Sequence, residues 1–148
     1  MTDAGLVDRA RAYAGFFEAL TEHTLADLDR YVAADVHFKD PFNDVRGVAA
    51  MTAVFAHMYR TCIEPGFRVL DVAVGDNAVL MHWQFEFRLR RFRPRLARRI
   101  EGVSRVCFSP DGRVTEHVDY WDAAEQVYEQ LPVVGVILRW LRRRLTAR

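Results

Sequence analysis

The stretch Asp35-Val36-His37-Phe38-Lys39-Asp40-Pro41-Phe42-Asn43 predicts a short strand that stops at an acidic residue. Proline cannot donate a hydrogen bond to a neighbouring strand and keeps the residue before it extended, so the strand should end at Asp40. The Asp40 carboxylate is thereby fixed at a strand end, between apolar Phe38 and Phe42. An acid in such surroundings can act as a general base. A lone Asp-Pro pair, however, more often caps the turn or helix that follows.

The remaining chain predicts helices first and strands second. Helical spacing of apolar residues predicts helices over residues 6–21, 25–33 and 48–61. Alternation and turn residues predict strands over residues 67–74, 78–91, 100–108 and 113–121. The second of these strands has one wholly apolar face, on which we expect Trp83, Phe85 and Phe87 to face the helices. A chain of 148 residues with 51% hydrophobic content can bury one core of this kind.

This order of elements, with Asp40-Pro41-Phe42 after the first strand and Tyr120-Trp121 at the end of the last, resembles the nuclear-transport-factor-2-like superfamily. Within it, the chain is most similar to the ketosteroid isomerase and SnoaL-like polyketide cyclase branch, over about residues 12–124. The resemblance implies an α+β, cone-shaped fold. In it, a strongly curved, mainly antiparallel sheet packs on three N-terminal helices around an apolar cavity. Residues 1–148 would form this single domain, with residues 132–148 as a C-terminal helical extension.

The last predicted strand carries the second group of candidate catalytic residues. His117, Asp119 and Trp121 share one face of it. If Trp121 points into the cone, as the resemblance implies, His117 and Asp119 point in with it and can meet Asp40 in an acid/base set. The alternatives are an internal polar network or a strand end that faces solvent. A metal site formed with His37 or His57 would lack a recognised ligand spacing, so we expect neither a metal nor a cofactor.

The isomerase resemblance can be carried over position by position. Asp40 falls where those enzymes keep the carboxylate that moves the proton, but Phe16 and Ser104 fall where they keep oxyanion donors, and Phe55 falls on a supporting tyrosine. Losing one such donor commonly costs about 3–4 kcal/mol of transition-state stabilisation, so we do not expect efficient 3-oxosteroid isomerisation. Tyr13, Tyr59 or His117 could supply a different donor. The predicted substrate-binding residues are Tyr13, Phe16, Phe55, Tyr59, Trp83, Phe85, Ser104 and Trp121.

Three functions remain open on these residues. The first is an isomerase, cyclase or dehydratase that acts on an apolar carbonyl compound; the sequence favours the broader class of small-molecule cavity proteins and does not decide between catalysis and binding alone. The second is a non-catalytic binder of an apolar small molecule. The third is an interaction module. The isolated Cys62 and Cys107, and an N-terminus without the features of a signal peptide, predict a cytoplasmic protein with free thiols.

Two arginine clusters, at residues 88–99 and 139–148, lack any accompanying nucleic-acid-binding motif, so we expect solvated surface and no nucleic-acid partner. The second cluster edges an apolar helix that begins at Pro132 and contains Trp140. That pattern is typical of a helix lying on a membrane surface. We favour instead a helix packed on the cone or on a partner subunit. The outward face of the long strand further predicts a homodimer.

Overall fold

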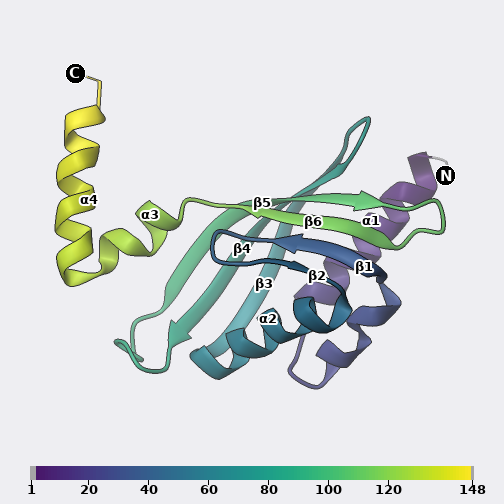
Figure 1. The fold of residues 1–148 in the computed structure, drawn as a ribbon, viewed down its shortest axis with the longest axis horizontal. Helices are drawn as coiled ribbons and strands as arrows, with labels where there is room; N and C mark the ends of the chain where they lie inside the picture. The colour runs from purple at the N-terminus through teal and green to yellow at the C-terminus, as the bar shows by residue number, and fades with distance from the viewer. Residues whose placement is uncertain (1–2, 148) are drawn as a thin grey trace.

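The computed structural model describes residues 3–147, in which six strands form one curved sheet accompanied by helices (Figure 1). The helices are α1 (Asp3–Glu18), α2 (Val48–Thr61), α3 (Ala123–Gln126) and α4 (Pro132–Leu145), with 3-10 turns η1 (Thr24–Arg30) and η2 (Tyr128–Gln130). The strands are β1 (Val32–Lys39), β2 (Asp44–Arg46), β3 (Cys62–Val74), β4 (Val79–Leu89), β5 (Arg98–Phe108) and β6 (Val114–Tyr120). The α+β fold class predicted from the sequence is confirmed.

The sheet has the order β2-β1-β6-β5-β4-β3, and every neighbouring pair is antiparallel except β1 and β6. In that parallel pair Phe38 lies opposite His117, and Lys39 opposite Val118. Asp40 directly follows β1 and Asp119 is the next-to-last residue of β6, so the two acids lie side by side near the ends of adjacent strands. The sheet topology thus places next to each other two acids that are far apart in the sequence.

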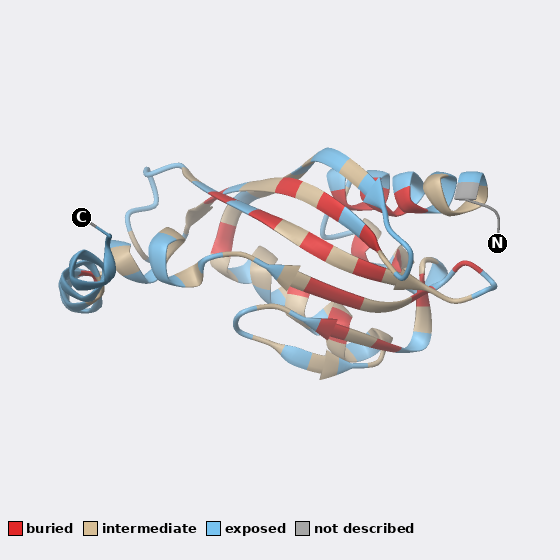
Figure 2. Ribbon diagram, turned by 90° about the horizontal axis from the view of Figure 1, so that it is seen from above, coloured by how far each residue is buried: buried red, intermediate tan, exposed pale blue. Residues whose placement is uncertain are grey.

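The core lies between the concave side of the sheet and the helices, with α1 packed on β3 and α2 on β1 and β3. Buried and partly exposed residues alternate along the strands, as Figure 2 shows. On β4 this alternation buries Val79, Met81, Trp83 and Phe87. The predicted inward face of the long strand is therefore correct, because period-two alternation places these side chains on one face.

Two local predictions were wrong. The helix predicted over residues 25–33 is the shorter 3-10 turn η1, because Val32 already pairs with Val114 in the sheet. The strand predicted over residues 67–74 begins earlier, at Cys62 directly after α2, so that β3 includes Pro65 and Gly66. The register of β3 on β4 shifts between Ile63 and Gly66, and a bulge of this kind accommodates a proline within a strand.

The C-terminal helix α4 does not pack over the cone. It stands at one end of the molecule, and its main contacts are with η2 (Figure 1). A helix packed on the cone would bury Ile137, Leu138 and Leu141, but Ile137 and Leu141 are exposed and Leu138 is only half-buried. Packing on the chain's own domain is therefore ruled out for most of the apolar face of α4. Within residues 3–147, no helix combines the length and the apolar character needed to cross a membrane.

Candidate functional site

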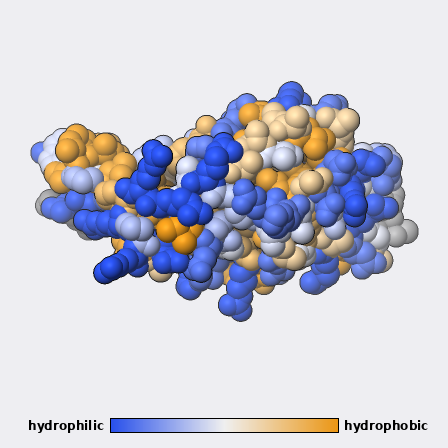
Figure 3. Space-filling view, turned by 90° about the horizontal axis from the view of Figure 1, so that it is seen from below, coloured by the Kyte–Doolittle hydropathy of each residue, from blue (hydrophilic) through white to orange (hydrophobic). Residues whose placement is uncertain are grey.

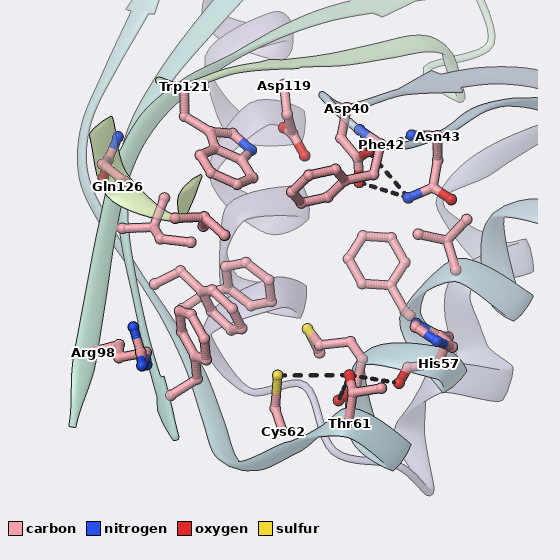
Figure 4. A pocket seen from close by; sticks show the side chains of 18 of the residues that line it. Asp40, Phe42, Asn43, His57, Thr61, Cys62, Arg98, Asp119, Trp121 and Gln126 are labelled. Carbon is pink, nitrogen blue, oxygen red and sulfur yellow. Dashed lines mark hydrogen bonds between the residues drawn. The ribbon is translucent and has the colours of Figure 1, made fainter. Parts of the chain in front are cut away.

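A largely apolar cavity of about 290 Å³ lies between α2 and the concave side of the sheet (Figure 4). Strands β3, β4 and β5 supply much of its wall, including Phe67, Trp83 and Phe85, and α2 supplies Phe55 and Met58. The polar side chains on the lining are Asp40, Asn43, His57, Thr61, Arg98, Asp119 and Gln126. An apolar pocket with a few polar groups is the usual form of a small-molecule site.

Asp119 points into this cavity and is held from behind by two donors. Its Oδ1 atom lies 2.8 Å from His117 Nε2 and accepts a hydrogen bond from the Ser104 hydroxyl at 2.5 Å. Among residues 3–147, no group donates a hydrogen bond to the other oxygen, Oδ2. The carboxylate is therefore oriented through one oxygen, and the other is left for a ligand.

The donors of Asp119 are themselves fixed in the core. The Tyr13 hydroxyl lies 2.7 Å from His117 Nδ1, and the indole N–H of Trp83 donates to Ser104 Oγ at 2.8 Å. Tyr13 keeps its proton, because burial and the negative charge of Asp119 raise its pKa well above the usual value. An ionised carboxylate only accepts, so a neutral imidazole beside Asp119 carries its proton on Nε2, and its Nδ1 then accepts from the Tyr13 hydroxyl. The internal polar network that the sequence left as an alternative is therefore present.

Asp40 lies beside Asp119 on the cavity wall, but its carboxylate holds the following turn. Oδ1 accepts hydrogen bonds from the backbone N–H groups of Phe42 and Asn43, both at 2.7 Å, and from the Asn43 side chain at 3.0 Å. Oδ2 accepts from the same Asn43 amide at 3.1 Å. This is an Asx turn, in which the acid replaces a backbone acceptor. The capping interpretation of the Asp-Pro pair therefore describes Asp40 well.

Arg98 and Gln126 lie on the cavity wall away from Asp119 (Figure 4) and were not singled out from the sequence. Arg98 Nε is the one buried side-chain nitrogen or oxygen in residues 3–147 that lacks a hydrogen-bond partner. Unpaired buried donors are costly, so Arg98 would be stabilised by a partner for this atom. Arg98 belongs to the arginine cluster that was expected to form solvated surface, although period-two alternation places it on the same face of β5 as the buried Ile100.

The predicted substrate-binding residues, taken with the predicted catalytic His117, fall into three groups. Phe55, Trp83, Phe85 and Trp121 line the main cavity. Ser104 and His117 line a second space of about 30 Å³ behind Asp119. Tyr13, Phe16 and Tyr59 line neither: Tyr13 supports His117 from the core, Phe16 packs 4.7 Å from the ring of Tyr31, and Tyr59 lies elsewhere on α2.

The histidines proposed as metal ligands lie apart. His37 bonds to Asp44 at 2.7 Å on the outer part of β1, whereas His57 lies on the cavity wall. In the described part of the chain, no three His, Cys, Asp or Glu side chains are placed to hold a metal ion.

We expect Tyr13 to make the protein sensitive to alkali. The unfolded chain releases the tyrosine proton near pH 10, but the folded chain retains it, because the Tyr13 pKa is raised by burial. The unfolded state then binds fewer protons, so the free energy of unfolding falls as the pH rises above about 10. The slope contributed by this residue reaches about 1.4 kcal/mol per pH unit.

Urea denaturation at a series of pH values measures that slope. Tyr13→Phe should flatten it, whereas Tyr120→Phe, at an exposed tyrosine, should leave it unchanged. An unchanged slope in Tyr13→Phe would mean that the Tyr13 hydroxyl is not the buried donor to His117.

Comparison with known proteins gives both a family and a set of structural neighbours. A family model described as a SnoaL-like domain matches residues 13–117. No curated protein sequence matches the chain significantly. A putative SnoaL-like polyketide cyclase from Shewanella denitrificans superposes with a TM-score of 0.65 at 24% identity, covering 82% of this chain and 98% of that one.

Two further solved structures are similar over most of the chain. An LEH-like epoxide hydrolase from M. tuberculosis has a TM-score of 0.67 at 19% identity and covers 96% of both chains. A hypothetical protein with a ketosteroid isomerase-like fold from Catenulispora acidiphila, in complex with trimethylamine, has a TM-score of 0.68 at 14% identity. It covers 84% of this chain and 93% of that one. At these identities the neighbours establish the fold, and the chemistry has to be argued from the residues of the cavity.

Proposed function

The chain belongs to the SnoaL-like domain family, and from that premise we propose that it is an enzyme that moves a proton next to the carbonyl group of an apolar compound. Isomerisation, cyclisation and dehydration all begin with such a step. The observation that carries the proposal is the Asp119 carboxylate, oriented through Oδ1 by His117 and Ser104 at the wall of an apolar cavity. Solved structures described as polyketide cyclases and as ketosteroid isomerase-like support the same class.

Asp119 is the proposed general base. Its Oδ2 atom removes a proton from the carbon next to the carbonyl, and the resulting carboxylic acid returns the proton to another atom of the substrate. His117 and Ser104 fix the direction of the carboxylate during both proton transfers. A base held in this way transfers a proton faster than the same base in free solution. The sequence interpretation placed the base at Asp40, but in the proposed mechanism Asp40 holds the turn that forms the adjacent wall.

The developing enolate oxygen requires a hydrogen-bond donor. The two donors that the family resemblance implies are absent, because Phe16 and Ser104 stand at their positions. The Trp121 indole is suited to this role, because it lines the cavity with its nitrogen turned toward the Asp119 side (Figure 4). No hydrogen bond from this indole to another described residue is formed. Arg98 on the opposite wall would bind a polar end group of the substrate. The preferred substrate is therefore an apolar body with a ketone at one end and an oxygen-rich group at the other.

Proton exchange on a simple bicyclic ketone tests the proposal directly. In deuterated buffer, the protein should accelerate exchange of the protons next to the carbonyl of 2-tetralone, as followed by NMR, and the rate should saturate with ketone concentration. Isothermal titration with the same ketone measures its binding. If 2-tetralone or a related bicyclic ketone binds and its exchange matches that of buffer alone, the enzyme proposal is wrong. The non-catalytic binder, favoured by the mainly apolar lining, would then be the function.

A further inference from the structure

We propose that α4 and the β4–β5 loop form a docking surface for an anionic lipid membrane. The proposal concerns the end of the molecule outside the catalytic residues, and its test does not depend on any enzymatic activity. It rests on the way in which α4 is attached to the domain, on the side chains that α4 leaves exposed, and on the charge of that end.

The polar edge of α4 faces the protein. Gly135, the only buried residue of the helix, lies so close to the backbone of Glu129 that an added Cβ atom would be 2.2 Å from the Glu129 carbonyl oxygen. On the same edge, Arg139 donates to that carbonyl, and Arg142 forms ion pairs with Glu129 at 3.1 Å and Glu125 at 3.5 Å. Most amphipathic helices do the opposite and turn their apolar side toward the domain.

The apolar face of α4 consequently points away from the domain. Its large side chains are solvent-accessible: Val133 at 73%, Ile137 at 59%, Trp140 at 56% and Leu145 at 78%. Figure 3 shows the corresponding apolar surface gathered at this end of the molecule. Contiguous exposed apolar surface on a soluble domain generally marks an interaction site. A tryptophan beside a basic residue is typical of helices that lie in a membrane interface, and Arg144 lies 4.9 Å above the Trp140 ring.

The charged residues on α4 itself and on the β4–β5 loop are all basic. Neither α4 nor the loop over residues 90–97 contains an acidic residue. The loop contributes the exposed Arg90, Arg91, Arg93 and Arg95, together with the exposed Leu96. Both α4 and this loop lie at the same end of the molecule in Figures 1 and 2. An anionic bilayer complements this face, because its interior is apolar and its headgroups, which would contact the arginines, are negatively charged.

A second copy of this chain is a poorer occupant for the same face. Two α4 helices joined in parallel through their apolar sides would bring Arg143 and Arg144 close to their equivalents, and in either orientation neither helix has an acid to compensate the arginines. Anionic lipid headgroups would instead neutralise them. The docked end also carries Gln126 and Val127, which line the cavity, so an apolar ligand could pass from the lipid into the cavity with little exposure to water.

Vesicle co-sedimentation of the full chain tests the proposal. We expect binding to vesicles of phosphatidylcholine mixed with phosphatidylglycerol, at least 10-fold weaker binding to phosphatidylcholine alone, and weakening as salt is added. Ile137→Gln/Leu141→Gln should reduce binding at least 10-fold. Leu70→Gln/Leu80→Gln is the matched control, because these leucines are comparably exposed on the sheet and should not matter.

Charge is tested in the same way. Arg143→Gln/Arg144→Gln should weaken binding to the anionic vesicles, whereas Arg11→Gln/Arg68→Gln, which removes two exposed arginines elsewhere, should have little effect. Circular dichroism and melting curves check that each variant is folded. Equal loss in test and control variants, or no binding by the full chain, overturns the proposal. A dimer in light scattering that Ile137→Gln/Leu141→Gln converts to a monomer would also overturn it, because a second copy would then cover the face.

Discussion

Replacing Asp119 by asparagine should lower the rate of proton exchange on a bound ketone by about 10²–10⁴-fold, the usual contribution of a positioned general base. Asparagine keeps the shape of the side chain, and its oxygen can still accept from His117 and Ser104. The group that faces the ligand, however, becomes an amide that cannot take a proton. Ketone binding, measured by isothermal titration, should change little, so that the loss appears in the rate of the bound complex.

Asp40→Asn is the matched control for this prediction. The Asp40 carboxylate accepts the N–H groups of Phe42 and Asn43, and an asparagine oxygen can still accept both. The Asn43 side chain loses one acceptor, so stability should fall modestly while exchange continues. The opposite result, with exchange abolished in Asp40→Asn and retained in Asp119→Asn, would assign the base to Asp40 and overturn the proposed mechanism.

Replacing Phe38 by alanine should lower the free energy of unfolding by about 3–5 kcal/mol, as is usual for a buried phenylalanine. Phe38 is 1% exposed, and its ring centroid lies 5.4 Å from that of Phe55 and 5.2 Å from that of His117. Its removal takes contacts away from the core and from the imidazole that orients Asp119. Urea denaturation measures the change, and Phe38→Leu gives a milder variant if the alanine variant does not fold.

Phe42 is the control for Phe38, because the two residues flank the same Asp-Pro turn and look equivalent in the sequence. Phe42 is 54% exposed, and its ring packs only at the edge of Trp121 and Tyr128. Phe42→Ala should therefore cost much less stability than Phe38→Ala, while it removes part of the cavity wall. Similar losses of stability in the two variants would contradict the inward orientation of β1.

The parts of the fold that were predictable depend on local periodicity. The alternation of β4 identified Trp83 and Phe87 as inward-facing, and helical spacing gave the bounds of α2 without error. The 3-10 turn η1 was not predictable in this way, because Val32 is drawn into the sheet by its pairing with Val114, 82 positions later. At Val32 the pairing within the sheet therefore overrides the helical preference of the local sequence.

The candidate site was predictable only where the strand pattern fixed a face. Once the resemblance placed Trp121 inside, His117 and Asp119 followed from alternation alone. The different environments of the two acids could not be predicted. Asp40 accepts hydrogen bonds from backbone N–H groups of its turn, and no sequence pattern reveals these bonds. The outward face of α4 was likewise hidden, since its attachment depends on the close approach of Gly135 to Glu129.

The parallel pairing of β1 with β6 also has a consequence for how the chain folds. The hydrogen bond between Tyr13 and His117 joins residues 104 positions apart, and Asp119 can reach Asp40 only when β6 has docked beside β1. Contacts between such distant segments close slowly, because a long loop must be ordered before they form. During synthesis α1, α2 and β1 emerge well before β6. The apolar interior should therefore be exposed and prone to association until β6 docks. Asp40 and Asp119 should come together only in the last steps of folding.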